Sequence, residues 1–441
     1  MVEEILARIA SRKYVVGVVG MGYVGLPLAL TAIRAGFHVI GFDTDPARVE
    51  LLNAGRSGIK HIPNEPIAEA SAQGRFKATS DLGKLNEADA ILIAVPTPLT
   101  KQREPDLTYI ENSTRAIAKT LRCGQLVVLE STTWPGTTRD VMLPILEETG
   151  LKAGEDFFLA FSPEREDPGN VSFCTATIPK VIGADDGASL RLACAVYDPF
   201  VIGTVPVSSA ATAEAVKLTE NIFRAINIAL VNELKVIFDK MGIDIWEVIE
   251  AAKTKPFGFM PFYPGPGLGG HCIPIDPFYL AWKAREHEVA TRFIELAGQI
   301  NTAMPHYVVG RLAEALDRNA SRGLNGARIL IIGLSYKKNI EDTRESPSLK
   351  LLEIIEQRGA TADYHDPFVA RIPRTREHPE FTGRRSVELD PQTIASYDAI
   401  VISTDHDSVD WSALTTHGRL IVDTRNVCAR NGLLGPKIVK A

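Results

Sequence analysis

The sequence lacks the cysteine patterns of disulfide-rich and zinc-binding proteins. Its five cysteines include no CxxC pair and have no metal-ligand spacing with the histidines; they are Cys123, Cys174, Cys194, Cys272 and Cys428. Scattered single cysteines are typical of a reducing compartment, because structural disulfides form in oxidising ones. We therefore expect free thiols, no metal site and a cytoplasmic location.

An excess of positive charge is also missing. The chain has 48 lysines and arginines against 54 aspartates and glutamates, a formal net charge of -6. This balance argues against nucleic acid and anionic membranes as partners, although a local basic pocket for a phosphate is compatible with it. The uncharged run Tyr14–Ile33 is long enough to cross a bilayer, but its four glycines and Pro27 favour a glycine-rich turn and no membrane insertion.

The length of 441 residues predicts two or three domains, and 45% hydrophobic with 23% charged residues is typical of a soluble globular protein. Strand-like runs alternate with helical patterns towards both ends, whereas the middle is helical. We expect an α/β fold class, with two Rossmann-like doubly wound domains joined by a central all-helical region with a long spine helix. The expected domain boundaries are 1–205, 206–320 and 321–441.

A glycine motif follows the first apolar run, Tyr14–Val19, and precedes a helical pattern. Its residues are Gly20, Met21, Gly22, Tyr23, Val24 and Gly25. Between a strand and a helix, GxGxxG permits a tight turn and the close approach of a pyrophosphate to the helix N-terminus. Asp43 ends the next strand and is suited to bind a ribose diol and to repel a 2′-phosphate. The motif therefore predicts NAD, with Arg48 the one nearby residue that favours NADP.

Polar residues follow later apolar runs in the first half of the chain. The runs 90–95, 126–130, 157–161 and 180–183 alternate with helical stretches and predict a doubly wound parallel sheet up to about residue 200. Function in such sheets lies at the carboxyl ends of strands. The candidates there are Val95-Pro-Thr97-Pro, Glu130-Ser-Thr132-Thr and Ser162-Pro-Glu164-Arg165. Taken singly, each of these segments is explained by the residue preferences of turns. Three such segments at the same edge of the sheet predict a functional site.

A long helix is predicted from Ala211 to Met241, where Gly242 ends it. Lys217 and Asn221 share one face of this helix because they are four residues apart. A solvated face is the ordinary explanation for a lysine and an asparagine. A cation with an amide is also the pair that stabilises a developing oxyanion.

A glycine-rich loop, Gly265–Gly270, leads to Cys272, and Asp276-Pro277 then resembles a helix N-cap and first residue. We expect the following helix to run from about Asp276 to Asn319. Most lone cysteines are inert core residues. The glycine context and the nearby helix N-terminus instead favour a thiolate nucleophile.

After a polar linker at 321–326, a second α/β pattern begins without a GxGxxG motif. This half is interpreted as a nucleotide fold that binds another phosphate-bearing ligand. Lys337, Arg344 and Arg425 are basic candidates at strand ends, and each is equally explained as a surface charge.

Together these features predict a four-electron oxidation of a primary alcohol. A first hydride transfer to NAD gives an aldehyde, which Cys272 attacks to form a thiohemiacetal. A second hydride transfer gives a thioester, which water hydrolyses to a carboxylate. A simple alcohol dehydrogenase does not need the cysteine.

The chain resembles the UDP-glucose/GDP-mannose dehydrogenase family over essentially its full length. The matching motifs, in the family's order, are Gly-Met-Gly-Tyr-Val-Gly-Leu-Pro-Leu-Ala at 20–29, Ser-Thr-Thr at 131–133, Ser-Pro-Glu at 162–164, Lys-Leu-Thr-Glu-Asn at 217–221, the cysteine loop, Gly-Leu-Ser-Tyr-Lys-Lys-Asn at 333–339 and Asp-Thr-Arg-Glu-Ser-Pro at 342–347.

The resemblance implies Cys272 as the covalent nucleophile and Lys217 with Asn221 as the oxyanion donors. It implies that Thr132 and Glu164 act on water and proton transfer, and that Asp276 positions the hydrolytic water, a role that competes with helix capping. The implied NAD contacts beyond the glycine motif and Asp43 are Arg48, Thr97, Thr132 and Arg344. The implied substrate contacts are Glu164, Arg165, Lys217, Asn221, Tyr263, Gly267, Gly269, His271 and Lys337.

Departures from the UDP-glucose enzymes indicate the branch. His271 precedes the cysteine, Ile275 precedes Asp276, and Arg165-Glu-Asp-Pro-Gly169 replaces the family's Phe-Leu-x-Glu-Gly. The aromatic-rich segment 255–267 resembles the branch that oxidises UDP-N-acetylglucosamine, or UDP-N-acetylgalactosamine, for bacterial surface polysaccharides. Its aromatics are suited to stack on uracil or to shelter an acetamido methyl, although packing is as common a reason. The expected partners are a UDP-sugar and a second copy of the chain in a homodimer or larger oligomer.

Other functions remain open. UDP-glucose and UDP-N-acetylmannosamine are the alternative substrates of the same mechanism. A two-electron β-hydroxyacid dehydrogenase shares the N-terminal fold and a helix lysine but has no use for Cys272 or a further α/β domain. A non-catalytic sensor of NAD or nucleotide sugars has no need to keep Cys272, Lys217, Asn221 and Asp276 together.

Overall fold

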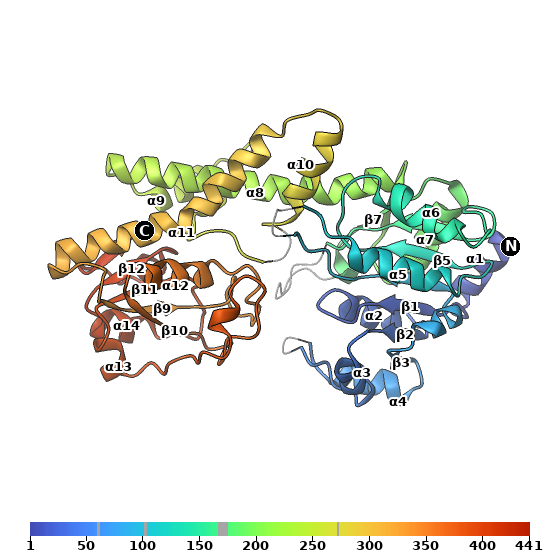
Figure 1. Ribbon diagram of the computed structural model, residues 1–441, viewed down its shortest axis with the longest axis horizontal. Helices are drawn as coiled ribbons and strands as arrows, with labels where there is room; N and C mark the ends of the chain where they lie inside the picture. Colours follow the sequence, from blue (N-terminus) through green and yellow to red (C-terminus); the bar gives the residue numbers. More distant parts are fainter. Residues whose placement is uncertain (60–61, 101–103, 166–174, 271–272) are drawn as a thin grey trace. The chain divides into compact units, whose positions relative to one another are not determined.

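The computed structural model describes residues 1–59, 62–100, 104–165, 175–270 and 273–441. The described chain divides into two compact units (Figure 1). Unit 1 comprises Met1–Glu220 with Phe278–Ala290, and unit 2 comprises Asn221–Pro277 with Thr291–Ala441. The fold class is the expected one, α/β with Rossmann-like halves and a helical middle, whereas the three domain boundaries stay a prediction.

Within the described residues of unit 1, eight strands form one sheet in the order β3-β2-β1-β4-β5-β6-β7-β8. Their bounds are β1 Val16–Val19, β2 Val39–Phe42, β3 Phe76–Thr79, β4 Ala90–Ile93, β5 Leu126–Leu129, β6 Phe158–Phe161, β7 Lys180–Gly183 and β8 Thr204–Val207. The central strands are buried at every position, which explains why they occur as continuous apolar runs in the sequence.

Helices cover this sheet and complete its core. They are α1 Val2–Ala10, α2 Gly25–Arg34, α3 Pro46–Asn53, α4 Glu65–Ala72, α5 Thr108–Ala118, α6 Leu143–Glu147, α7 Gly187–Tyr197 and the first part of α8 Ala210–Met241. Side chains of α1, α2 and α7 form one buried cluster with alternate residues of β1, β4, β5 and β6. Alternation is expected because successive strand side chains point to opposite faces.

One strand pairing differs from the expected parallel sheet. Phe161 of β6 pairs with Gly183 of β7 in the antiparallel sense, whereas β8 is parallel to β7. The apolar runs indicate buried strands but carry no information about their direction. Burial on both faces of the sheet, which we interpreted as a sign of parallel strands, is therefore also compatible with an antiparallel neighbour.

Unit 2 contains a parallel sheet of five strands among its described residues, in the order β10-β9-β11-β12-β13. The strands are β9 Arg328–Ile332, β10 Thr361–His365, β11 Ala399–Ile402, β12 Ile421–Asp423 and β13 Ile438–Lys440. The helices are the remainder of α8, α9 Ile245–Ala252, α11 Arg292–Ala320, α12 Pro347–Gln357, α13 Pro391–Ala395, α14 Trp411–His417 and α15 Val427–Arg430. Side chains of α11 and α12 pack on one sheet face, and those of α13 and α14 pack on the other.

The single helix expected from Asp276 to Asn319 is wrong: the structure has α10 Asp276–Glu286 and, after a break, α11. Glu288 adopts a left-handed φ of 56°. The N–H of Val289 donates to the carbonyl of Ala284, and the N–H of Glu288 donates to that of Arg285. This is a Schellman helix end. Sequence reasoning missed it because glutamate stands where glycine is the usual signal.

Candidate functional site

The glycine motif forms the turn from β1 into α2, and its three glycines serve different purposes. Gly20 has a φ of 92°, and a Cβ there would lie 2.4 Å from the carbonyl oxygen of Ala94. A Cβ on Gly25 would lie 1.8 Å from the carbonyl oxygen of Gly20. A Cβ on Gly22 would meet nothing within 4 Å. Gly20 and Gly25 are therefore required by the turn itself, whereas Gly22 leaves open space at the helix N-terminus.

Asp43 and Arg48 lie beside this turn, as the sequence predicts. Asp43 Oδ2 accepts a hydrogen bond from the N–H of Met21 at 2.9 Å, and its Oδ1 accepts one from the N–H of Asp45. Arg48 Nη1 donates to the carbonyl of Met21 at 3.3 Å, and its Nε lies 3.9 Å from Asp43 Oδ2. The open space at Gly22 and the adjacent carboxylate fit a pyrophosphate and a ribose diol. These residues would hold NAD.

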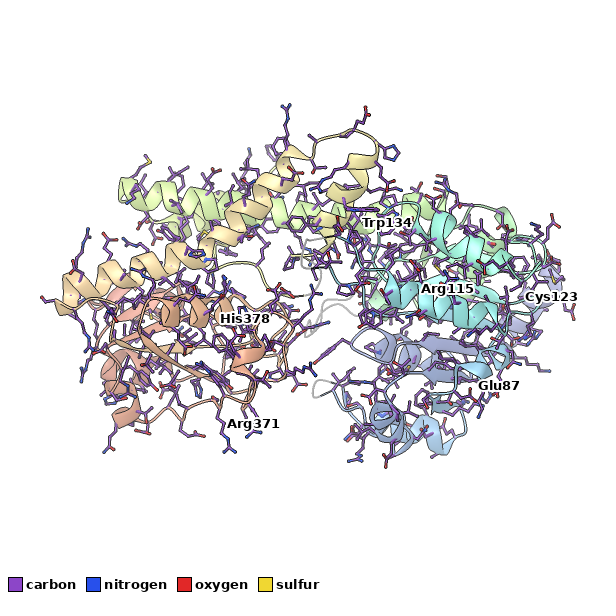
Figure 2. The ribbon with its side chains drawn as sticks, viewed as in Figure 1. Glu87, Arg115, Cys123, Trp134, Arg371 and His378 are labelled. Carbon is purple, nitrogen blue, oxygen red and sulfur yellow. The ribbon has the colours of Figure 1, made fainter. Side chains whose placement is uncertain are left out.

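The strand ends predicted to form one rim come together in unit 1. Ser131 Oγ donates to the carbonyl of Val95 at 2.7 Å, which joins the segments after β5 and β4. Thr97 is buried and Thr132 is partly buried there. Trp134, labelled in Figure 2, stacks on Tyr279 of α10 and contacts Trp282 of the same helix with its ring tilted by 45°. These contacts fix the segment that carries Thr132.

The segment after β6 is bound to α8. Lys217 Nζ donates to the carbonyl oxygen of Glu164 and lies 3.4 Å from its Oε2. Arg165 Nη2 donates to Glu220 Oε1 at 2.6 Å, and its Nη1 donates to the carbonyl of Pro179. The lysine is buried, with 4% of its side chain exposed against 14% for Glu164. The structure therefore gives the predicted oxyanion donor a carboxylate partner that sequence reasoning did not assign to it.

A pocket opens beside these residues in unit 1. Its lining includes Val24, Leu28, Glu130, Glu164, Arg165 and Lys180. Glu130 begins one of the candidate segments predicted at the strand ends but was given no role of its own, and Lys180 was not predicted as a site residue. The available signals were an acid at the end of an apolar strand and a lysine at the start of another.

In unit 2, Asn221 of α8 is paired with Asp276, the first residue of α10. Asn221 Nδ2 donates to Asp276 Oδ2, and Arg224 Nη2 donates to Asn221 Oδ1. Asn221 and Asp276 are almost completely buried. Arg224 is a further residue that sequence reasoning missed. The hydrogen bond from Asn221 is compatible with both of the roles considered for Asp276.

Cys272 and His271 lie outside the described residues, but the glycines before them are described. The N–H of Gly270 donates to the carbonyl of Arg344 at 3.0 Å. A Cβ on Gly269 would lie 2.4 Å from Cβ of Tyr336, and one on Gly267 would lie 3.2 Å from Pro347 Cβ. The glycines therefore let the loop lie directly against the segment 336–347. Arg344 itself forms a bidentate ion pair with Asp342.

Tyr263 lies on the aromatic-rich segment before this loop. Its ring stacks on Trp246 with a centroid distance of 5.7 Å, and its hydroxyl donates to Glu250 Oε1 at 2.7 Å. The hydrogen bond to Glu250 raises the pKa of Tyr263. The ring keeps 40% exposure, so one face remains available for a ligand.

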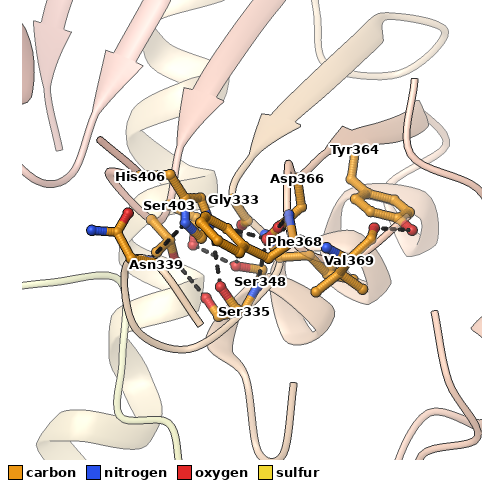
Figure 3. A network of polar contacts seen from close by, with 12 residues as sticks. Gly333, Ser335, Asn339, Ser348, Tyr364, Asp366, Phe368, Val369, Ser403 and His406 are labelled. Atoms are coloured by element: carbon orange, nitrogen blue, oxygen red, sulfur yellow. Dashed lines mark hydrogen bonds and ion pairs between the residues drawn. The ribbon is translucent and has the colours of Figure 1, made fainter. Parts of the chain in front are cut away.

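A buried polar network holds the loop that carries Lys337 (Figure 3). Asp366 Oδ2 accepts from the N–H groups of Leu334 and Ser335 and from His406 Nε2 at 3.0 Å. His406 Nδ1 accepts from the N–H of Asn339 at 3.0 Å. Burial opposes the ionised form of Asp366, but these hydrogen bonds lower its pKa to about 2. The loop after β9 is thus fixed on both sides of Lys337.

Two substitutions separate the roles of the glycines. Gly22→Ala adds a methyl group to open space, so the ligand-free protein should melt within about 1 °C of wild type, while the NAD Kd rises at least about tenfold. Gly25→Ala should lower the melting temperature without any ligand, because its Cβ collides with the turn. Differential scanning fluorimetry and an NAD fluorescence titration measure both effects. Unchanged NAD affinity in Gly22→Ala would contradict the assignment.

Among the residues that the structure describes, no helix is long and apolar enough to span a bilayer. Within the same residues, no group of three or more histidine, cysteine, aspartate or glutamate side chains is arranged to hold a metal ion.

Three sequence models of one family match consecutive parts of the chain. They are described as the NAD binding domain, the central domain and the UDP binding domain of the UDP-glucose/GDP-mannose dehydrogenase family, and they match residues 14–201, 211–303 and 330–430. The predicted site residues fall within these ranges.

Named relatives cover nearly the whole chain. UDP-N-acetyl-D-mannosamine dehydrogenase of Pyrococcus horikoshii is 36% identical over 93% of this chain and 95% of its own. UDP-N-acetyl-D-glucosamine 6-dehydrogenase of Pseudomonas aeruginosa is 35% identical over 89% of this chain and 90% of its own. A solved structure of the UDP-N-acetylmannosamine enzyme from Pyrococcus horikoshii is similar with a TM-score of 0.85 at 34% identity, covering 97% of this chain and 98% of that one.

The three family models match nearly the whole chain. The glycine turn with Asp43 and the paired residues of α8 agree with this match. The chain belongs to the UDP-glucose/GDP-mannose dehydrogenase family and is an NAD-dependent oxidoreductase.

Proposed function

We propose that this protein oxidises the C6 hydroxyl of UDP-N-acetylglucosamine, or of UDP-N-acetylgalactosamine, to the uronic acid, for bacterial surface polysaccharide synthesis. The observation that carries the proposal is the pair of buried contacts on α8. Lys217 bonds to Glu164, and Asn221 bonds to Asp276. These are a cation, an amide and two carboxylates, the groups that an oxyanion and a hydrolytic water require.

NAD, when bound, accepts a hydride from the substrate carbon in each of two oxidations. In the proposed mechanism the thiolate of Cys272 adds to the C6 aldehyde and forms a C–S bond. The ammonium of Lys217 and the amide N–H of Asn221 stabilise the resulting alkoxide. The second oxidation leaves a thioester. Water then adds to its carbonyl carbon, a carboxylate of Glu164 or Asp276 takes the water proton, and the C–S bond breaks to release Cys272.

The proton positions in this scheme follow from burial. A buried ammonium needs a nearby negative charge, and Glu164 supplies it for Lys217. When the alkoxide forms, a second negative charge appears beside the same lysine. The ammonium of Lys217 therefore serves as an electrostatic donor to the alkoxide, and the carboxylate of Glu164 lies beside it to accept a proton from the hydrolytic water.

The choice of sugar rests on the aromatic-rich segment 255–267. Phe257 and Phe259 are exposed, and Tyr263 keeps one face open. Such a surface suits a uracil ring or an acetamido methyl. Relatives at 33 to 36% identity are named as dehydrogenases of UDP-N-acetyl-D-mannosamine, UDP-N-acetyl-D-glucosamine or NDP-N-acetyl-D-galactosaminuronic acid. UDP-N-acetylmannosamine and UDP-glucose are the alternative substrates.

A substrate panel and a cysteine variant test the proposal. UDP-N-acetylglucosamine or UDP-N-acetylgalactosamine should give a kcat/KM at least about tenfold above that of UDP-glucose, since one matched apolar contact contributes about 1 to 3 kcal/mol. Cys272→Ser should release no uronic acid from either sugar. Cys123→Ser, which replaces an exposed free cysteine, is the control and should match wild type. Preference for UDP-N-acetylmannosamine or UDP-glucose would overturn the substrate, and full activity of Cys272→Ser would overturn the mechanism.

We also propose that the protein is a homodimer through α8. Phe223, Leu230, Ile237 and Met241 form a row on this helix, and each is 45 to 63% exposed in the single chain. Large apolar side chains at this spacing on one helix face are typical of an interface.

Leu230→Glu tests the dimer, because it buries a charge if the row is an interface. Sedimentation velocity should give twice the chain mass of 48.0 kDa for wild type and the single mass for the variant. Lys240→Gln makes the same change in net charge at an exposed position off the row and should remain dimeric. A wild-type monomer, or an unaffected Leu230→Glu, would reject this interface.

A further inference from the structure

Two opposite charges are buried together beneath the pocket of unit 1. Glu130 follows β5 and Lys180 begins β7, and their side chains are 1% and 6% exposed. Lys180 Nζ donates to Glu130 Oε2 at 2.5 Å. The hydroxyl of Tyr197, the last residue of α7, donates to the other oxygen, Glu130 Oε1. The carboxylate is therefore held from two sides.

Stability does not explain this arrangement. Removing two charges from water is costly, and well-packed apolar residues in place of a buried ion pair are often neutral or stabilising. Burial raises the pKa of Glu130, and the adjacent ammonium opposes that shift. The neighbouring sheet residues of the core, among them Leu126, Val128 and Phe158, are apolar, so packing does not require this pair.

The pair contacts the segment that carries Glu164. Lys180 Nζ makes a second hydrogen bond, to the carbonyl oxygen of Pro163 at 3.0 Å. The next carbonyl along the chain, that of Glu164, accepts from Lys217. Two buried ammonium groups therefore hold two consecutive carbonyls. Glu130, Lys180 and Glu164 also line the same pocket, together with Val24 and Leu28 from the glycine turn and α2.

We propose that Lys180, fixed by Glu130 and Tyr197, is a positioning residue that sets where the Glu164 carboxylate lies during hydrolysis of the thioester. The inference rests on the proposed function, with Glu164 rather than Asp276 as the carboxylate that takes the water proton. In that step water adds to the thioester carbon, Glu164 takes one water proton, and the C–S bond breaks with the electron pair going to sulfur. A displaced Glu164 slows this step, whereas the glycine turn and Asp43 still bind NAD.

The test uses the full-length protein and the double variant Glu130→Gln/Lys180→Met, which removes both charges and leaves neither unpaired. Product release should fall by about 10 to 100-fold, the effect of misplacing a catalytic group by roughly 1 Å. The NAD Kd should change less than about twofold. Rapid mixing with the UDP-sugar should give a burst of NADH, and intact-mass spectrometry should show a covalent sugar adduct that wild type does not accumulate. Lys180→Arg, which keeps the charge and a donor, should restore part of the rate.

A structural role predicts a different pattern. If NAD affinity, the burst and turnover all fall in proportion, or if the double variant turns over like wild type with no adduct, the positioning role is overturned. If the double variant does not fold, Tyr197→Phe removes one hydrogen bond from Glu130 and no charge. The Tyr197→Phe variant should accumulate the same covalent adduct with a smaller loss of turnover rate. Absence of the adduct in this variant would also overturn the proposal.

Two controls separate this inference from the proposed function. The adduct must disappear in the triple variant that adds Cys272→Ser, because the thioester is on that sulfur. Wild type that yields a single NADH and an aldehyde would refute the proposed function itself, whatever the variants of Lys180 do.

Discussion

The burial of the Lys217 ammonium is the constraint on which the candidate site in unit 1 depends. An ammonium that is almost completely removed from water needs a counter-charge and hydrogen-bond acceptors. Glu164 supplies both through its carbonyl and its carboxylate. This requirement fixes the segment after β6 to α8. The same segment is held from the other side by Lys180, so its position follows from two buried cations rather than from a loop conformation alone.

In unit 2 a buried carboxylate, that of Asp276, is hydrogen-bonded by a neutral amide. Asn221 donates to Asp276, so a carboxylate that is 1% exposed still has a hydrogen-bond donor. The glycine-rich loop then lies against Tyr336 because it carries no Cβ atoms there. Asp366 and His406 hold the loop with Lys337 by the same principle, with every buried polar atom of the aspartate accepting backbone or imidazole hydrogens.

Sequence reasoning succeeded where a local pattern has one physical meaning. The glycine turn with Asp43 and the long helix with Lys217 are of this kind, because each depends on spacing within a short segment. The reversed strand β7 was missed because burial on both faces does not report direction. The break after α10 was missed because Glu288 takes the left-handed position that glycine usually signals. The pairs Glu130–Lys180 and Asp366–His406 join residues 50 and 40 positions apart, and no local pattern encodes such a contact.

The central claim is that one active site oxidises the same carbon twice, with Cys272 holding the substrate between the two oxidations. The most direct measurement is the amount of NADH formed per UDP-N-acetylglucosamine consumed, with the sugar limiting and the product identified by mass spectrometry. The account predicts two NADH per sugar and a uronic acid. One NADH per sugar with an aldehyde as the product would contradict it and would indicate a two-electron dehydrogenase.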